Sequence, residues 1–500
     1  MPPVKKRKQW SIWRYEYAYD EYRKVEPMRQ KVSDCLQGEE YVKSKEEYLR
    51  KTQWYKKHND EYQAFVARAT FYSKTSYALR VYEGLVTAGE PEILLPEDGG
   101  MDFLRRYATV YKSDLHSLQV RLNRDQFTYG LRVMVAEPTG DAKNPFVIKE
   151  YGASSFLRAY FVDIKGESVA KFVLMDESTM AFDIKTKSST FKERLRVFGL
   201  DRNNQYYQCA ISPEEWAAFD VDNPPLDPPG TPDEQKKLIY PRYKGRLMNR
   251  IPVTWCGASS LSGSTFDIPV LLDVANFDLK LYNLDANYAQ HLYQSSQETV
   301  FFTHTTKDFK LDNICYGSGA HNSLPGDVDV KVVSVNGIGF SEQREYMNSV
   351  KEEISTRIMS VMSSKSHQSG TAIGIVQNAQ TSPIRTIVET SAAAITDQLR
   401  LIAKWMGYSD EEISKVSYTP SNEFAKIDTD LSAFIGLCRA VYEGAVPMLE
   451  EDLYRFAKMC GFVNSKRDFS EFKKLHDQEI RQRKDDLAIM PDKQGGQAAD

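Results

Sequence analysis

The stretch PVLLDVANFDLKLYNLDANYAQHLYQSSQ, residues 269–297, decides how the rest of the chain is organised. Large apolar side chains recur in it every three or four residues, which is the spacing of one face of an α-helix, and they are Val274, Phe277, Leu281, Leu284, Tyr288 and Leu292. Pro269 suits the first turn of this helix, where no backbone N–H is needed. Most charged side chains of the stretch lie away from the apolar stripe. The pattern therefore predicts one long helix that packs along its whole length.

A second helix with its own apolar stripe is predicted over residues 341–360. Ser341 suits its N-cap and Glu342 its first turn, and the stripe is Met347, Val350, Ile354, Ile358 and Val361. Residues 299–339, between the two helices, are rich in glycine and in short apolar runs, which favours a small β module. Two long antiparallel helices bury their stripes either within one chain, as a bundle with an inserted hairpin, or against neighbouring copies. The pattern alone leaves both possibilities open.

A weakly charged polar stretch, SVMSSKSHQSGTAIGIVQNAQTS (residues 360–382), follows the second helix. It contains one charged residue, Lys365, and no acidic residue occurs between Glu353 and Glu389. We expect a loop over residues 361–383, because clusters of Ser, Thr and Gly favour loops. A third helix is predicted from residue 384, with Gly407 placed to end it, and its stripe is Val388, Ala392, Ile395, Leu399, Ile402 and Met406.

The remaining segments predict a mixed α+β protein. Residues 60–86 have helical spacing, whereas several runs rich in Val, Phe and Tyr between residues 126 and 270 are typical of strands. FDVDNPPLDPPGTPDEQ, residues 219–235, contains five prolines and is expected to be an exposed, extended loop. After the third helix we expect a short strand near residues 415–419, helices over 428–463, and a charged mobile tail over 464–500.

Composition places the chain among globular proteins and restricts the classes of function. Of the 500 residues 41% are hydrophobic and 27% are charged, and the net charge is −4. This charge argues against a protein that coats nucleic acid with an overall basic surface. The six cysteines form no CxxC pair, so zinc binding has no local support and a reduced cytosolic compartment is expected. No apolar run is long enough for a transmembrane helix, so we expect no membrane partner.

Motifs for catalysis are nearly absent from the sequence. It has no GxxxxGK(S/T) phosphate loop, no HExxH and no GxSxG. His304 and His321 flank the predicted β module without a nearby carboxylate trio, and Asp327 with Asp329 forms only half of a nuclease-type metal site. We therefore expect no enzyme, no cofactor and no metal. A metal-dependent nucleic-acid enzyme that uses Asp327 and Asp329 stays as an alternative.

Four stretches together carry a resemblance to a known family. They are GEEYVKSKEEYLRKT with the helix that follows it (residues 38–86), YGLRVMVAEP (129–138), IPVTWCGASSLSG with the helix after it (251–297), and the order of elements over 299–406. In these the chain resembles a tailed-bacteriophage portal protein, the head-to-tail connector, of a portal-like family formerly classed as a domain of unknown function. The resemblance spans residues 38–465, and no single short motif carries it. One departure is EPEILLPEDGG, residues 90–100, which is shorter and more acidic than the family's segment.

The resemblance implies a portal-type architecture with an α/β wing, a two-helix stem, a small β clip, a long wing-crossing helix and a helical crown. Residues 1–268 would be the N-terminal arm and wing, 269–297 and 341–360 the stem helices, and 299–339 the clip. Residues 361–383 would be the tunnel loop, 384–427 the long helix and returning wing strand, 428–463 the crown, and 464–500 the tail.

The resemblance also implies a function. Portal proteins form a homo-oligomeric ring, usually a dodecamer, at the portal vertex of the virion's head-tail junction, and assemble in the host cytoplasm. Double-stranded DNA passes through the channel during packaging and ejection. The implied protein partners are the terminase packaging motor, the major capsid protein with its scaffold, and a head-completion or tail adaptor protein. Another ring or adaptor protein of the virion is a further alternative.

The same resemblance assigns roles to individual residues. The tunnel loop would meet DNA with hydroxyls, amides and one cation, which contact phosphates weakly and without sequence preference, and its residues are Ser363, Ser364, Lys365, His367 and Gln368. Asp278 and Asp285 lie seven residues apart on one helix face, which we expect to line the channel. Packing between subunits in the stem is expected at Val274, Phe277, Leu281, Leu284, Val350 and Ile354.

Overall fold

The computed structural model describes residues 20–87, 89–164, 166–184, 187–232, 236–261, 267–296, 299–303, 329–333, 339–359, 370–420, 435–436, 438–439, 450–459, 468–476 and 478. The chain divides into two compact units. The larger unit comprises residues 1–87, 91–363 and 377–420, and the smaller unit comprises residues 88–90, 364–376 and 421–500.

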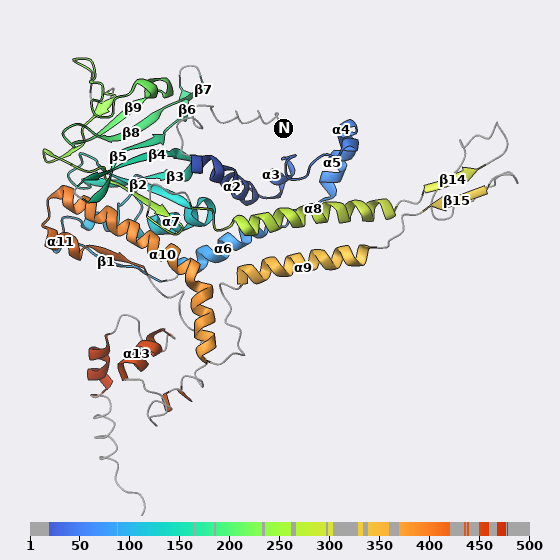
Figure 1. The fold of residues 1–500 in the computed structure, drawn as a ribbon. Coiled ribbons are helices and arrows are strands. Elements are labelled where there is room, and N and C mark those ends of the chain that lie inside the picture. Colours follow the sequence, from blue (N-terminus) through green and yellow to red (C-terminus); the bar gives the residue numbers. More distant parts are fainter. Residues whose placement is uncertain are drawn as a thin grey trace, which may run out of the picture. The chain divides into compact units, whose positions relative to one another are not determined.

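Two antiparallel sheets form the body of the larger unit (Figure 1). Within the described residues one sheet has the strand order β13-β2-β3, with the bounds Val253–Gly257, Leu131–Pro138 and Phe146–Gly152. The other has the order β10-β9-β8-β5-β4, with the bounds Leu238–Ile239, Tyr206–Ile211, Leu195–Leu200, Glu167–Asp176 and Phe156–Ile164. Apolar side chains of both sheets share one hydrophobic core. The predicted mixed α+β class is therefore confirmed.

The larger unit also contains shorter strands and helices. Two small hairpins are β6 with β7 and β11 with β12, with the bounds Thr179–Asp183, Ser188–Lys192, Arg242–Tyr243 and Arg246–Leu247. Three 3-10 helices are η1, η2 and η3, with the bounds Asp102–Arg105, Ala153–Ser155 and Pro213–Ala218. The strand expected near residues 415–419 is present as β16, Ser417–Thr419, and it pairs with β1, Glu92–Leu94. Between α10 and β16 lies the short helix α11, Asp410–Lys415.

Helix α7, Leu115–Tyr129, corrects the expectation of a strand from residue 126 onward. The Asp114 side chain accepts a hydrogen bond from the Ser117 N–H at the start of this helix. At its end Gly130 has φ 75°, and its N–H donates to the carbonyls of the last helical turn. Both are standard helix-end signals, so the strand β2 begins only at Leu131. A side chain at Gly130 would also collide with the backbone of Asp267.

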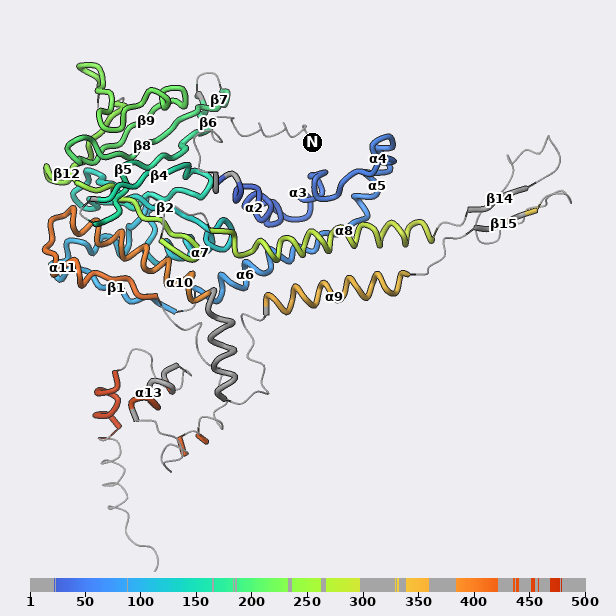
Figure 2. Tube along the Cα trace, viewed as in Figure 1, coloured from blue at the N-terminus to red at the C-terminus, as the bar shows by residue number. Residues whose placement is uncertain are grey.

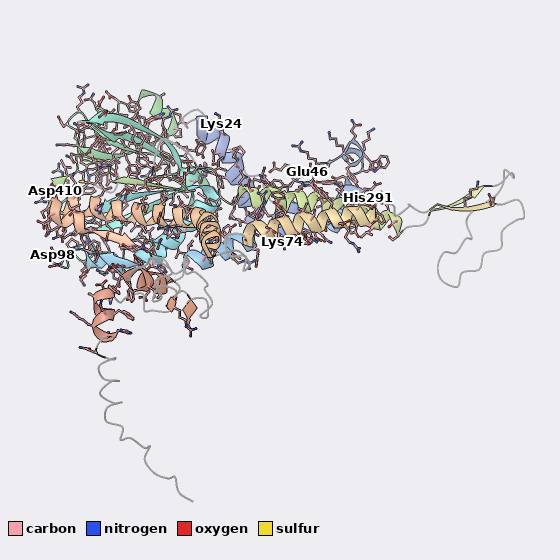
Figure 3. All side chains as sticks on the ribbon, turned by 60° about the horizontal axis from the view of Figure 1, so that its bottom comes forward. Lys24, Glu46, Lys74, Asp98, His291 and Asp410 are labelled. Atoms are coloured by element: carbon pink, nitrogen blue, oxygen red, sulfur yellow. The ribbon has the colours of Figure 1, made fainter. Side chains whose placement is uncertain are left out.

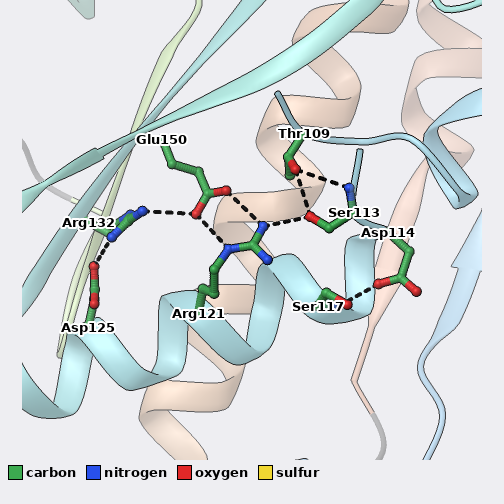
Figure 4. Close-up of polar contacts among 8 residues, drawn as sticks. All are labelled: Thr109, Ser113, Asp114, Ser117, Arg121, Asp125, Arg132 and Glu150. Carbon is green, nitrogen blue, oxygen red and sulfur yellow. Dashed lines mark hydrogen bonds and ion pairs between the residues drawn. The ribbon is translucent and has the colours of Figure 1, made fainter. Parts of the chain in front are cut away.

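A buried ion network fixes α7 to the three-stranded sheet (Figure 4). The Arg121 guanidinium on α7 donates to both oxygens of Glu150 on β3, at 2.8 and 3.1 Å. Arg132 on β2 donates to Glu150 Oε2 at 3.1 Å and also pairs with Asp125 on α7. The Glu150 side chain is only 1% exposed. One carboxylate therefore holds two cations that come from different elements.

Helix α10, Gly370–Met406, packs across the three-stranded sheet. The Gln398 amide donates to Thr254 Oγ1 on β13 at 2.8 Å and to the Met134 carbonyl on β2 at 3.3 Å. Gly407 ends the helix with φ 93°, as predicted. The helix begins well before the predicted residue 384, so the expected loop over 361–383 is too long. The Ser, Thr and Gly of residues 370–382 favoured a loop, but this segment is helical and Pro383 lies inside the helix.

Two long helices, α8 (Leu272–Ser295) and α9 (Phe340–Met359), lie side by side in the larger unit (Figure 1). The hairpin β14 (Thr299–Thr303) with β15 (Asp329–Val333) stands between them in the sequence. The N-terminal helices α2, α5 and α6 pack against α8, and Figure 2 shows α6 following it. The bounds of the N-terminal helices α2 to α6 are Asp20–Leu36, Glu39–Lys43, Gln53–Lys57, Asn59–Arg68 and Lys74–Val86.

In the smaller unit the structure describes helix α13, Glu450–Met459, which lies within the residues predicted as the crown. The ring of Tyr454 contacts Phe469 and Phe472, with centroid distances of 5.4 and 4.7 Å. Residues 469–476 are helical. The first part of the predicted C-terminal tail is therefore a helix that packs on α13.

Candidate functional site: the paired helices

Apolar side chains of helices α8 and α9 are buried within one chain, between these two helices and the N-terminal helices. Val274 and Leu281 on α8 are buried, and so are Met347, Val350, Ile354 and Ile358 on α9. These residues belong to the stripes predicted from the sequence, and they are covered within a single chain. We expected six residues to pack against a neighbouring subunit, namely Val274, Phe277, Leu281, Leu284, Val350 and Ile354. This expectation is wrong for Val274, Leu281, Val350 and Ile354, which are buried within one chain. Phe277 and Leu284 are partly buried.

Polar and aromatic contacts hold both ends of the helix pair. At one end Arg357 on α9 lies 3.9 Å from Asp273 on α8, and its guanidinium stacks 4.7 Å from the centre of the Phe277 ring. At the other end His291 Nδ1 lies 3.1 Å from Gln343 Oε1. Residue numbers rise along α8 as they fall along α9, so the helices are antiparallel over their whole length.

Asp278 is buried and caps a neighbouring helix, which corrects the expectation that it lines a channel. The Asp278 side chain is 0% exposed. Its Oδ2 accepts hydrogen bonds from the Thr75 N–H at 2.9 Å and from Thr75 Oγ1 at 3.0 Å. Helix α6 begins at Lys74 and receives no side-chain cap from its own N-cap residue, Ser73. The N–H groups of a first helical turn need an acceptor, and Asp278 supplies it from another helix.

Asp285 is also buried, and it fixes the link between α5 and α6. Its two oxygens accept hydrogen bonds from the Thr70 N–H at 2.7 Å and from the Tyr72 hydroxyl at 2.9 Å. Lys351 on α9 lies 4.3 Å from the centre of the Tyr72 ring and 3.2 Å from its hydroxyl oxygen. The expectation that Asp285 lines a channel is therefore wrong in the same way as for Asp278. The seven-residue spacing does put both acids on one face, but this face meets the N-terminal helices.

Three further contacts attach the N-terminal segment along α8. Lys31 donates to Asn276 at 2.9 Å, and the Arg68 guanidinium donates to Gln290 at 2.6 Å. Asn283 donates to the Tyr48 carbonyl at 2.9 Å. In Figure 3, Lys74 at the start of α6 and His291 near the end of α8 both lie along the paired helices. Helical spacing did not predict this role of residues 31–75, because their partners on α8 lie on more than one side of that helix.

Burial raises the pKa of Asp278 to about 6, although the hydrogen bonds from Thr75 act in the opposite direction. Between about pH 4 and pH 6 the Asp278 carboxyl is therefore protonated in the folded protein and ionised in the unfolded chain, which has the ordinary carboxyl pKa. The contribution of Asp278 to the free energy of unfolding therefore falls as the pH rises from about 4 to 6, and it stays lower above that range.

We predict that Asp278→Asn removes this part of the pH dependence. Relative to the parent protein, the variant should gain about 2 kcal/mol in free energy of unfolding between pH 4 and pH 7. Urea unfolding of both proteins at several pH values measures the difference, and Asp285→Asn serves as the comparison. If the difference in free energy of unfolding between the Asp278→Asn variant and the parent is the same at every pH in this range, Asp278 does not titrate there.

The other predicted site residues are distributed as follows. Ser363, Ser364, Lys365, His367 and Gln368 lie outside the described residues, as do His304, His321 and Asp327. Asp329 is exposed on β15, 4.0 Å from the Lys331 ammonium. Among the residues that the structure describes, no three His, Cys, Asp or Glu side chains are grouped so that they could hold a metal ion. No helix in that part of the chain is long and apolar enough to cross a membrane.

Comparison with known proteins gives one family match and a number of similar solved structures. A family model described as a domain of unknown function (DUF4055) matches residues 270–406. A solved structure described as the neck of an empty GTA particle, computed with C6 symmetry, is 9% identical and has a TM-score of 0.38. That match covers 80% of this chain and 92% of the other chain, and its TM-score is too low to support an argument. No curated protein matches the chain. The family match thus spans α8, the hairpin, α9 and α10 as one block.

Proposed function

We propose that this chain is a portal protein of a tailed bacteriophage, which forms a ring at one capsid vertex and gives double-stranded DNA a channel for packaging and ejection. One observation carries the proposal. Two long helices run antiparallel side by side, the described residues between them form the strands β14 and β15, and a third long helix, α10, follows them in the sequence. The family match covers this same block of residues.

The parts of the chain have corresponding roles in this proposal. Helices α8 and α9 are the stem, the module with β14 and β15 is the clip that meets the packaging motor and the tail adaptor, and the two sheets are the wing. The tunnel-loop role stays with Ser363 to Gln368, which lie outside the described residues and precede α10 in the sequence. Net charge is −4 per copy, so a ring of such copies repels DNA overall and favours sliding over binding. We expect no catalytic activity.

The channel-facing acids of the stem need a new assignment, because Asp278 and Asp285 are buried. The exposed side of α9 carries Glu345 and Glu352, which lie seven residues apart and therefore on one face. The rest of this side is polar as well, with Asn348, Ser349 and Ser355. We assign this side of α9 to the channel or to its water-filled margin.

Negative-stain images of the purified chain test the proposal. We expect closed rings with a central opening and a narrow stem. A solid monomer that cleaves DNA only with Mg²⁺, and loses this activity on Asp327→Ala, would instead support the enzyme. Rings that never package DNA when supplied to a packaging extract would point to an adaptor protein of the virion.

Lys365→Ala is expected to reduce DNA packaging or retention and to leave ring assembly unchanged. One cation per subunit, repeated around the ring, contributes salt-dependent attraction to phosphates. The measurement is the amount of nuclease-protected DNA per ring, with Lys415→Ala on the surface helix α11 as the matched control. Equal protection in both variants would remove Lys365 from the DNA path.

A further inference from the structure

Hydrogen bonds hold the described part of the proline-rich loop between η3 and β10 near Leu226, whose side chain is exposed to solvent. Asp227 accepts hydrogen bonds from the Lys237 and Leu238 N–H groups, at 2.8 and 3.1 Å. The Tyr207 hydroxyl donates to the Val221 carbonyl at 2.9 Å. Prolines on both sides of Leu226 restrict the backbone further. Leu226 is nevertheless 84% exposed.

An exposed leucine on a rigid loop has the properties of a docking anchor. Such a side chain loses little conformational freedom on binding, because its backbone is already ordered. The loop around it is acidic, with Asp220 and Asp222 exposed. The matching surface should therefore be apolar at its centre and basic at its margin.

A groove of this kind lies at the junction of β4, β13 and α10. It has a volume of about 590 Å³. Its apolar lining includes Phe161 on β4, Trp255 on β13 and Leu401 on α10, and its cationic lining consists of Arg250, Arg400 and Lys404. Arg250 and Lys404 are exposed. Asp397 is the single acid among the residues that line the groove in the described part of the chain.

The loop and the groove lie at opposite edges of the five-stranded sheet. The strand order is β10-β9-β8-β5-β4, the loop connects β9 to β10, and Phe161 in the groove belongs to β4. Figure 1 shows β9, β8, β5 and β4 following one another across the sheet. Neighbouring strands are about 4.8 Å apart, so the two edges are separated by roughly 19 Å. Within one chain the loop does not reach the groove.

We propose that the Leu226 loop of one copy docks in the groove between β4, β13 and α10 of the next copy. Leu226 enters the apolar part beside Phe161 and Trp255, and the acids of the loop face Arg250 and Lys404. Proline-rich extended segments are well suited to aromatic grooves, because their conformation is preformed. A contact between two different surfaces of identical chains repeats head to tail and closes into a ring when the rotation permits. The inference thus rests on the proposed ring and names one of its contacts.

Leu226→Asp tests this contact, because it places a charge in the apolar part of the groove while the loop keeps its own hydrogen bonds. We expect the protein concentration at half-maximal ring assembly to rise about tenfold or more. The matched control is Ile184→Asp, at a residue that is 82% exposed on the separate β6–β7 hairpin, and it should assemble like the parent protein. Light scattering after size-exclusion chromatography measures both. Equal assembly of the Leu226→Asp variant and the parent overturns the proposal.

A cross-linking experiment separates failure of this contact from failure of the ring itself. The double variant Leu226→Cys with Leu401→Cys is treated with a short bis-maleimide, and the parent protein and each single substitution serve as controls for the native cysteines. We expect a ladder of covalent oligomers on a denaturing gel with the double variant only. Rings that form without this ladder refute the contact and leave the proposed function intact. Absence of rings in the parent protein refutes the proposed function.

Discussion

Replacing Glu150 with alanine is expected to lower the free energy of unfolding of the larger unit by about 3–5 kcal/mol. Glu150 is buried and accepts hydrogen bonds from both Arg121 and Arg132. Asp125 remains as a partner for Arg132, but Arg121 has no other carboxylate at this site (Figure 4). Loss of the carboxylate leaves Arg121, whose side chain is only 32% exposed, without its carboxylate partner, and this costs more than the net value of the ion pair itself.

Urea unfolding followed by far-UV circular dichroism measures this effect at a fixed protein concentration. Glu150→Gln keeps the shape and one carbonyl acceptor, so its cost should lie between that of the parent and that of the alanine variant. Asp102→Ala is the control for an exposed pair, because Asp102 and Arg105 are 3.3 Å apart at the surface, and it should cost less than about 1 kcal/mol. Equal midpoints for Glu150→Ala and Asp102→Ala would show that the network contributes little to stability.

The regular apolar patterns made the helix pair predictable. The stripes on residues 269–297 and 341–360 predicted two long helices, and α8 and α9 have bounds within a few residues of these ranges. An apolar stripe predicts that one face of a helix is buried, but it does not predict which chain covers that face. For this reason the sequence left an intramolecular pair and an intersubunit pair open. The burial of Val274 and Ile354 within one chain decides between them.

The buried acids were not predictable from helical spacing alone. Asp278 and Asp285 share a face, and acids on one face usually mean solvent. Here the partners come from residues 70–75, about two hundred positions earlier in the chain. A buried carboxylate is tolerated when backbone N–H groups satisfy it. Such a pairing depends on tertiary structure, so no local pattern contains it.

The burial of these stripes has a consequence for the proposed ring. Because apolar side chains of α8 and α9 are covered within one chain, these helices would offer a neighbouring copy mainly polar side chains. The apolar contacts that stabilise a ring must then come from another part of the chain. In our proposal these contacts come from the exposed Leu226 and the groove at β4, β13 and α10. The integrity of this groove depends on how firmly α10 is held against the sheets.

Trp405→Ala is expected to cost about 3–5 kcal/mol of unfolding free energy, because Trp405 joins α10 to both sheets. It is 1% exposed, and its ring lies 5.4 Å from Phe146 on β3 and 6.0 Å from Tyr206 on β9, between ring centres. Its indole N–H donates to the Arg246 carbonyl at 3.3 Å. Truncation removes all of these contacts and leaves a cavity that surrounding rings fill only in part.

Thermal and urea unfolding of Trp405→Ala, Trp405→Phe and Trp54→Ala measure this effect. Trp405→Phe keeps most of the ring volume and should lose clearly less than Trp405→Ala, whereas Trp54 is 58% exposed and its removal should have little effect. Similar unfolding midpoints for Trp405→Ala and Trp54→Ala would contradict the packing role. If Trp405→Ala is strongly destabilised and Trp405→Phe still forms rings, α10 is anchored by this packing, and the groove that it lines survives modest repacking beneath it.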